Sequence, residues 1–280
     1  MKPTLATLLV GALLLTAAAC DNGKLDDTGT GEAEVLDPEP AGAPTAVADG
    51  RLTCLGNNEP DPASSGALEL TGYVRTFADP NADDPPPAAT VEIYDGDGTL
   101  LETGFADSEK DGRVAISVPV RPAGFTGSVV VSEPGYLDWR FTTSLAITGS
   151  SVNGWAWLLT ETELADQAAN AGVDISEGVL IGAVHDCDGF GVANAVVVVD
   201  GDAEPEDLTY FDGFDASGGG TYTGPSGRFA VPFEANGSVT IKAFARLESG
   251  GPLVLLSTVT TAVSEGMVSS VSLEPRAGLQ

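Results

Sequence analysis

DGRVAISVP, residues 111–119, decides the fold, because a turn-forming Asp-Gly pair leads into alternating apolar and polar residues. The alternation places Val114, Ile116 and Val118 on one face, which predicts a strand that buries this face. The same pattern returns in SGRFAVP, residues 226–232. A turn and a half-buried strand that occur twice predict an all-β chain with an internal repeat.

Three further landmarks recur in the same order around this hairpin, at a spacing of about 110 residues. Each is a short run rich in β-branched residues, as strands prefer. Together with the hairpin they predict two copies of one unit. The pairs are ELTGYV (69–74) with VLIGAV (179–184), ATVEIYD (89–95) with AVVVVD (195–200), and GSVVV (127–131) with GSVTI (237–241).

Each unit contains seven apolar segments of strand length, bounded by Gly, Pro, Asp or Ser. Seven short strands in about 100 residues, without intervening helices, predict two tandem Ig-like or transthyretin-like antiparallel β-sandwiches. The expected strands are 68–75, 89–95, 99–106, 113–119, 126–133, 136–144 and 152–159 in the first sandwich, and 178–185, 194–200, 207–212, 227–232, 237–246, 252–261 and 267–273 in the second.

The repeated motifs resemble the carboxypeptidase regulatory-like, or transthyretin-like, domains that occur in tandem on bacterial surface proteins. The resemblance rests on a G-x-V strand (72–74 and 182–184), an A-x-V strand (89–91 and 195–197), the repeated hairpin, and Gly135-Tyr136 in the first unit. It covers residues 68–275. The second unit lacks the Gly-Tyr pair, and its stretch 211–220 is longer than a hairpin turn. In that family these domains are accessory modules without catalytic residues, so the resemblance implies fold more than function.

Between the units, residues 160–172 carry the helical signal of the chain. Thr160 and Glu163 form a capping box, and Gly172 stands where a left-handed C-cap belongs. We therefore expect a short connector helix that fixes the angle between the two sandwiches.

The N-terminus has the layout of a signal peptide over residues 1–19, with Lys2, an apolar run at 8–15 and small residues at 17–19. Together with Cys20 it resembles the bacterial lipobox, except that Ala17 stands where Leu is more usual. The resemblance implies a diacylglycerol, with palmitate-type chains, on Cys20. It further implies a lipid-anchored, extracytoplasmic place in the bacterial cell envelope, periplasmic or at the surface.

Residues 20–50 are rich in acids, Pro and Gly and have no periodic apolar face. We expect them to form a disordered acidic tether. The sandwiches then occupy residues 51–159 and 173–280. The formal net charge of −29 becomes −30 without the signal peptide, because Lys2 leaves with it. Such a field repels nucleic acid, so nucleic-acid binding is not expected.

No pattern of catalytic residues is found. The single histidine, His185, precedes Asp186, and adjacent strand residues point to opposite faces, so the two cannot easily pair. Ser226 lies in a repeated hairpin turn rather than in a G-x-S-x-G motif. A structural role for His185 is expected, and we expect no enzyme, no cofactor and no metal.

Acidic loops leave calcium open as an alternative, although none has the EF-hand pattern. Trp139, Trp155 and Trp157 could form a sugar platform, but burial in the core accounts for them more simply. The acidic clusters are Asp79, Asn81, Asp83 and Asp84; Asp95 and Asp97; and Asp200, Asp202, Glu204, Glu206 and Asp207.

Cysteine arithmetic gives one further hypothesis. If lipid consumes Cys20, then Cys54 and Cys187 remain in an oxidising compartment, and we expect a disulfide between them. Two independent thiols or a bridge between chains are the alternatives. The expected function is a lipid-anchored, non-catalytic binding or structural presentation module, whose partner is an unidentified envelope protein or polysaccharide. The alternative is a calcium-dependent or carbohydrate-binding adhesion module.

Overall fold

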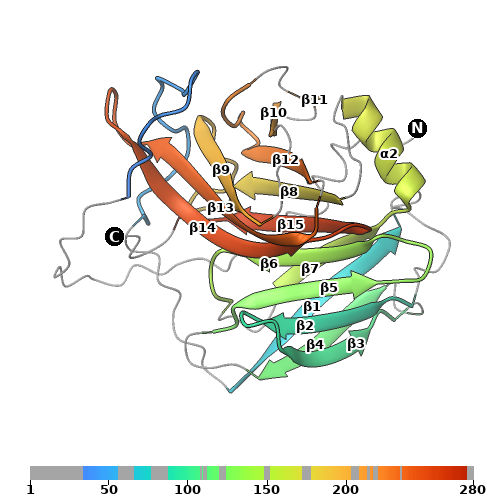
Figure 1. Ribbon diagram of the computed structural model, residues 1–280. Helices are drawn as coiled ribbons and strands as arrows, with labels where there is room; N and C mark the ends of the chain where they lie inside the picture. The colour runs from blue at the N-terminus through green and yellow to red at the C-terminus, as the bar shows by residue number, and fades with distance from the viewer. Residues whose placement is uncertain are drawn as a thin grey trace.

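The computed structural model describes residues 34–55, 66–76, 88–107, 109, 112–119, 124–147, 152–171, 178–202, 208–212, 215–216, 220–233 and 235–275. Within these residues the chain forms strands β1 to β15 and helix α2 (Figure 1). The all-β fold class is therefore confirmed. The signal peptide and Cys20 lie outside the described residues.

The observed strands agree with the expected segments to within two residues at each end. The short β11 was not expected. The first half contains β1 (Ala67–Thr76), β2 (Thr90–Asp95), β3 (Leu100–Phe105), β4 (Arg113–Pro119), β5 (Gly127–Ser132), β6 (Asp138–Thr143) and β7 (Val152–Leu158). The second contains β8 (Gly178–Val184), β9 (Ala195–Gly201), β10 (Thr209–Asp212), β11 (Asp215–Ala216), β12 (Arg228–Phe233), β13 (Gly237–Arg246), β14 (Leu253–Val263) and β15 (Met267–Leu273).

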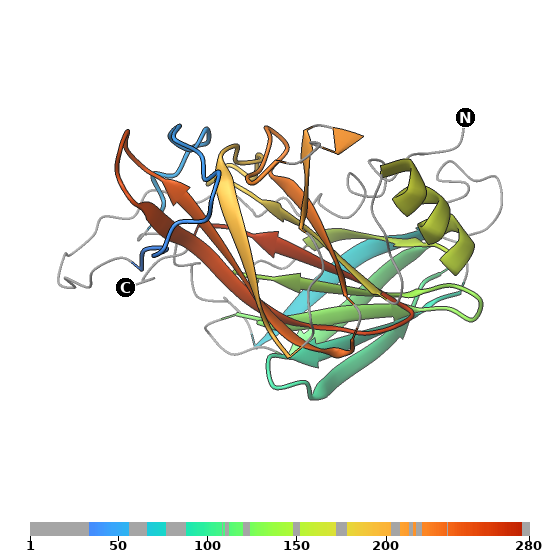
Figure 2. The same cartoon turned by 45° about the horizontal axis from the view of Figure 1, so that its top comes forward.

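These strands form three sheets, which we name by position. The central sheet has the order β11-β10-β12-β8-β15-β6-β5-β2-β3. The first outer sheet is β4-β1-β7, and the second outer sheet is β14-β13-β9. The two halves of the chain therefore share one continuous central sheet, and each half adds an outer sheet of its own (Figures 1 and 2).

The internal repeat is visible in the strand pairing. β1 pairs with β4 antiparallel and with β7 parallel, and β8 pairs with β12 and β15 in the same two ways. In both units the hairpin glycine is left-handed, with φ of 70° at Gly112 and 69° at Gly227. Each glycine carbonyl accepts a bond of 2.9 Å from the last valine of the G-x-V motif, Val74 or Val184. The repeated sequence landmarks therefore produce a repeated local geometry.

The junction between the halves differs from two separate antiparallel sandwiches. β15 runs parallel to β8 on one side and parallel to β6 of the first half on the other. At this junction the buried Trp139 donates a hydrogen bond of 3.0 Å from Nε1 to the hydroxyl of Ser270. The sequence predicted antiparallel strands joined by short connections within each unit. The parallel pairing of β6 with β15 joins strands of different units and was therefore not predicted.

β10 marks the second departure from the repeat. Its counterpart β3 pairs with β2, whereas β10 pairs with β12 and not with β9, the counterpart of β2. The hydroxyl of Tyr210 on β10 accepts a hydrogen bond of 2.9 Å from the backbone N–H of Val197 on β9. Burial raises the pKa of Tyr210, so this hydroxyl stays neutral. A side chain thus takes over part of the pairing that a strand supplies in the first unit.

The hydrophobic cores also cross the expected domain boundary at residue 173. The core beneath the first outer sheet includes Val179, Ile181 and Phe211 from the second half. The core beneath the second outer sheet is built from β8, β9 and β12 to β15. β8 is buried along its whole length, which explains its nearly continuous apolar sequence GVLIGAV. The two halves are therefore one packed body.

The connector helix α2 spans Glu161–Ala171, as the capping signal predicts. The backbone N–H of Thr160 donates to the Glu163 carboxylate at 2.8 Å, and the N–H of Glu163 donates to the Thr160 hydroxyl at 3.3 Å. This is the reciprocal capping box. Leu164 is buried in the first core, so the helix is held against the body. Gly172 lies outside the described residues.

Residues 34–50 are not the disordered tether that their composition suggests. With residues 51–55 they form a segment, the N-terminal strap, that lies along the second half (Figure 1). The N–H of Leu36 donates to the carbonyl of Leu253, and the N–H of Leu255 donates to the carbonyl of Glu34, both at 2.9 Å. Leu36 packs on the apolar cluster of Val196, Phe244, Leu253 and Leu255. A few apolar side chains and main-chain bonds thus order a largely polar segment.

The end of the strap also corrects a boundary. Residues 51–55 were assigned to the first sandwich, but Leu52 and Leu55 pack on the core of the second. Arg51 accounts for this placement, because its N–H donates to Asp186 at 2.9 Å and its guanidinium pairs with Asp188 at 3.0 Å. Residues 20–33 of the expected tether lie outside the described residues.

Deletion of residues 34–50 is expected to lower the free energy of unfolding by about 2 kcal/mol or more, because it exposes to water the apolar cluster that Leu36 covers. Denaturant unfolding of the deletion variant against the full chain measures the loss. A matched control is Val35→Ser, since Val35 is 46% exposed and its replacement should change little. Equal stability of the deletion variant and the full chain would contradict the packing of the strap.

Candidate functional site

His185 lies in a buried hydrogen-bond network and not in a catalytic arrangement. Its Nδ1 is 2.9 Å from the hydroxyl of Ser272, which donates to the Glu274 carboxylate at 2.6 Å. The neighbouring Asp186 accepts bonds from the backbone N–H groups of Arg51, Asp188 and Phe190. The two adjacent side chains therefore serve different partners. Ser226, the other candidate from the sequence, donates to the carbonyl of Phe211 at 3.1 Å.

Burial lowers the pKa of His185, and the nearby Arg228 lowers it further, while Glu274 and Asp186 act in the opposite direction. In the unfolded chain a histidine titrates near about 6.5. Below that pH the unfolded state binds the proton more readily than the folded state, so stability falls as the pH drops through about 6.5.

We therefore expect the melting temperature to fall between pH 8 and pH 5.5 more steeply in the parent protein than in a His185→Gln variant. The steeper slope reflects the cost of keeping the buried imidazole neutral. Melting curves at intervals of half a pH unit measure it, and parallel curves for the two proteins would show that His185 does not titrate in this way.

The expected disulfide is confirmed. Cys54 and Cys187 are bonded, with their Cα atoms 5.9 Å apart. The N–H of Cys187 donates to the carbonyl of Arg51 at 2.9 Å, so the bond closes a loop that main-chain contacts already bring together. It fastens the end of the strap to the loop after β8. The lipid attachment at Cys20 lies outside the described residues and remains an expectation.

The described acidic residues form no cluster in which three His, Cys, Asp or Glu side chains could hold a metal. Asp95 forms a turn, since its Oδ1 accepts the N–H groups of Asp97 at 3.0 Å and Thr99 at 2.8 Å. The cluster 79–84 and Glu204, Glu206 and Asp207 lie outside the described residues. In the part of the chain that is described, no helix has the length and apolar character needed to cross a membrane.

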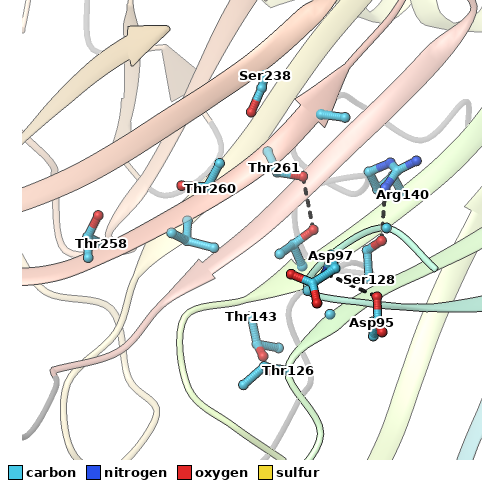
Figure 3. A pocket seen from close by; sticks show the side chains of 16 residues that line it. Asp95, Asp97, Thr126, Ser128, Arg140, Thr143, Ser238, Thr258, Thr260 and Thr261 are labelled. Atoms are coloured by element: carbon cyan, nitrogen blue, oxygen red, sulfur yellow. Dashed lines mark hydrogen bonds between the residues drawn. The ribbon is translucent and has the colours of Figure 1, made fainter.

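A groove of about 460 Å³ lies where the second outer sheet ends above the central sheet (Figure 3). We call it the Thr-rich groove. Its floor comes from β5 and β6, its wall from β14, and one end from the turn between β2 and β3. It is lined by Asp95, Gly96, Asp97, Gly98, Thr126, Gly127, Ser128, Arg140, Thr142, Thr143, Ser238, Thr258, Val259, Thr260, Thr261 and Ala262.

Arg140 is the cation of the groove floor. Its Nη1 donates to the hydroxyl of Ser128 at 2.9 Å, and its guanidinium lies 5.9 Å from the ring centre of Tyr94. Its Nε is buried without a hydrogen-bond partner. Among the described residues no carboxylate forms an ion pair with it, since Glu92 instead accepts the Tyr94 hydroxyl at 2.8 Å. Burial lowers the pKa of Arg140, which nevertheless stays charged.

β14 forms the wall of the groove and is fixed directly above β6. The hydroxyls of Thr261 and Thr142 share a buried hydrogen bond of 2.9 Å (Figure 3). The hydroxyl of Ser269 on β15 donates to the carbonyl of Ala262 at 2.8 Å. These two bonds fix the second outer sheet against the central sheet. The groove between them has hydroxyl groups on both sides and a cation on its floor. Such a surface can bind a polar ligand that carries an anionic group.

Sequence reasoning missed this groove, because its residues come from segments far apart in the chain. The available signal was the run STVTTA at residues 257–262, in which three threonines share one strand. Asp95 and Asp97 were singled out as a cluster, and the structure places them at the end of the groove. Trp139 lies in the core, whereas the side chains of Trp155 and Trp157 lie outside the described set.

No protein-family model and no curated protein matches this chain. Among solved structures, the Bacillus anthracis TIE protein is similar at 16% identity and a TM-score of 0.24, over 75% of this chain and 34% of that one. The chain thus spans about a third of that protein's length.

Two further solved structures are similar at the same level. The minor pilin GBS52 of Streptococcus agalactiae matches at 13% identity and a TM-score of 0.24, over 75% of this chain and 96% of that one. A B repeat unit of the collagen binding surface protein of Staphylococcus aureus matches at 11% identity and a TM-score of 0.22, over 70% and 96%. These scores are too low to place the chain in any of these groups.

Proposed function

We propose that this chain is a lipid-anchored, non-catalytic protein of the bacterial cell envelope that presents one rigid body and binds an envelope protein or polysaccharide in the Thr-rich groove. The observation that carries the proposal is the groove itself. There a cation that forms no ion pair with any described carboxylate, a row of hydroxyls and the edge of a strand meet on a surface fixed by two sheets.

The absence of a catalytic role is part of the proposal and is supported by the partners of the candidate residues. Ser226 donates its hydroxyl to a backbone carbonyl, and His185 bonds to Ser272 within a buried network. Neither geometry leaves a nucleophile facing a base in a cleft. Turnover of generic ester, peptide or glycoside substrates that survives purification would contradict this part.

Lipid anchoring is tested at Cys20, whose thiol is the atom that diacylglycerol would join. We expect the parent chain, produced in a bacterium, to enter the detergent phase and to carry a lipid mass at its N-terminus, because two or three acyl chains anchor stably. Cys20→Ala should remain in the aqueous phase. A Cys20→Ala variant that partitions like the parent would refute the anchor, whatever the groove binds.

A further inference from the structure

We propose that the Thr-rich groove takes an extended protein segment, which pairs as an added strand with the free edge of β14 and sets a carboxylate against Arg140. The inference rests on the proposed binding function and names the class of partner. It is argued from the outward main-chain groups of Thr258 and Thr260 on β14, from the strap that already bridges to the same edge, and from the cation beneath that edge.

The outward-facing groups of β14 follow from the pairing register. The N–H of Val197 bonds to the Tyr210 hydroxyl and so points away from β13. Val197 and Ala243 on β13 therefore form a non-hydrogen-bonded pair, and the main-chain groups of Ala243 point toward β14. There Ala243 pairs with Ser257, whose main-chain groups point back toward β13. Alternation along β14 leaves the N–H and C=O groups of Thr258 and Thr260 pointing outward, over the groove.

These outward groups are open. No residue in the described segments of the chain bonds to the main-chain N–H or C=O of Thr258 or Thr260. Thr260 is exposed, and Thr258 is half-buried. An accessible strand edge with unpaired groups is a template for another strand, and addition to such an edge is a common way to bind an extended peptide.

The same edge already binds an extended segment at its other end, through a single β-bridge. Val35 of the strap forms an antiparallel bridge with Val254, held by the bonds between Leu36 and Leu253 and between Leu255 and Glu34. The strap therefore occupies residues 253–255 of β14, and residues 258–260 continue the same edge. A register shift between Leu255 and Ser257 separates the two stretches, and each presents outward main-chain groups on this edge.

Charge decides what the segment carries. Arg140 lies on the groove floor with one side-chain hydrogen bond and no ion pair to a carboxylate in the described part of the chain, so a carboxylate of the ligand would gain a charge-assisted bond there. The net charge of −29 opposes a polyanion, which limits the ligand to few carboxylates. Asp95 and Asp97 at the end of the groove would repel a ligand carboxylate there, so the structure favours an extended peptide with a single acidic side chain at Arg140.

The test uses phage-displayed random nonapeptides selected on the full mature chain in detergent, followed by affinity measurement with the enriched peptide in synthetic form. Thr260→Pro removes the outward N–H, while Thr260→Ala keeps it, and both lose the hydroxyl bond to Thr240. We expect Thr260→Pro to weaken binding about tenfold or more and Thr260→Ala to leave it nearly unchanged, since the loss of one hydrogen bond of this kind is of that size.

Arg140→Gln should weaken binding of the acidic peptide about tenfold but not that of its Gln-substituted counterpart. If Thr260→Pro fails to fold, hydrogen exchange of the parent protein gives the answer, because peptide binding should slow exchange of the Thr258 and Thr260 amides. Failure to enrich any peptide, unchanged exchange at these amides, or equal losses for Thr260→Ala and Thr260→Pro would overturn the proposal. The last outcome indicates recognition through hydroxyls, as for a glycan. Lipid anchoring is measured separately at Cys20.

Discussion

Replacing Cys54 and Cys187 together by Ser is expected to lower the free energy of unfolding by about 5 kcal/mol. The two cysteines are 133 residues apart, and a crosslink over a loop of this length strongly restricts the unfolded chain. The Cα–Cα separation and the main-chain contacts around Arg51 suit the bond, so strain in the folded state offsets little of this stabilisation. Urea unfolding of the parent and the double variant, at equal chain concentration, measures the difference.

Reduction of the parent protein under native conditions is the matched control, and it should reproduce the stability of the double variant. The single variant Cys54→Ser tests the pairing itself, since Cys187 should then be a free thiol that takes one label per chain. A loss below about 1 kcal/mol would mean that the crosslink restricts the unfolded chain little, and the entropic account would be wrong.

Trp139→Ala is expected to cost about 3–5 kcal/mol, the range for removing a fully buried large aromatic side chain. Trp139 is 1% exposed and bonds through Nε1 to Ser270 across the junction of the two halves. Because the central sheet is continuous, we expect the variant to unfold in one transition at a lower temperature, with both halves lost together. Calorimetry measures the number of transitions and the loss.

The matched control for Trp139 is Phe105→Ala on β3, where the ring is 67% exposed. Its replacement should change the stability by about 0.5 kcal/mol or less. Two well-separated transitions in the parent or in Trp139→Ala would show that the halves fold independently, and the role assigned to the junction of β6 and β15 would fail.

The strands could be predicted because each carries its own local signal. Alternation, turn glycines and repeated landmarks are properties of a few neighbouring residues, and they set strand bounds without knowledge of partners. Gly182 of the G-x-V motif carries a packing requirement as well, since a Cβ there would lie 2.3 Å from the ring of Phe229 on the paired strand β12.

The sheet order could not be predicted in the same way. The pairing of β6 with β15 joins edges that lie about 130 residues apart, and nothing in either strand's alternation names the other. The strap was misassigned for a related reason. Its composition is that of a tether, but Leu36 and a few main-chain bonds use an apolar patch that another part of the chain provides.

The disulfide could be predicted from the cysteine count, because two thiols in an oxidising compartment have few alternatives. The groove could not be predicted, because it forms only where the second outer sheet lies against the central sheet. In the sequence Arg140 is an ordinary strand residue, and only the structure shows that β14 lies above it and that its Nε is buried without a hydrogen-bond partner. Sites made at the junction of distant elements leave little trace in a local sequence pattern.

The position of the disulfide has a mechanical consequence. If Cys20 is held in a membrane, a pull on the folded body enters the described chain at Glu34 and first loads the strap's bonds to β14. Those bonds can peel one after another, but peeling stops at Cys54, where the covalent link passes the load to the loop after β8. About twenty residues would then be released, roughly 70 Å of added length, while the sheets stay folded. The strap would thus lengthen the link between the membrane and the folded body by a fixed amount, which the disulfide limits.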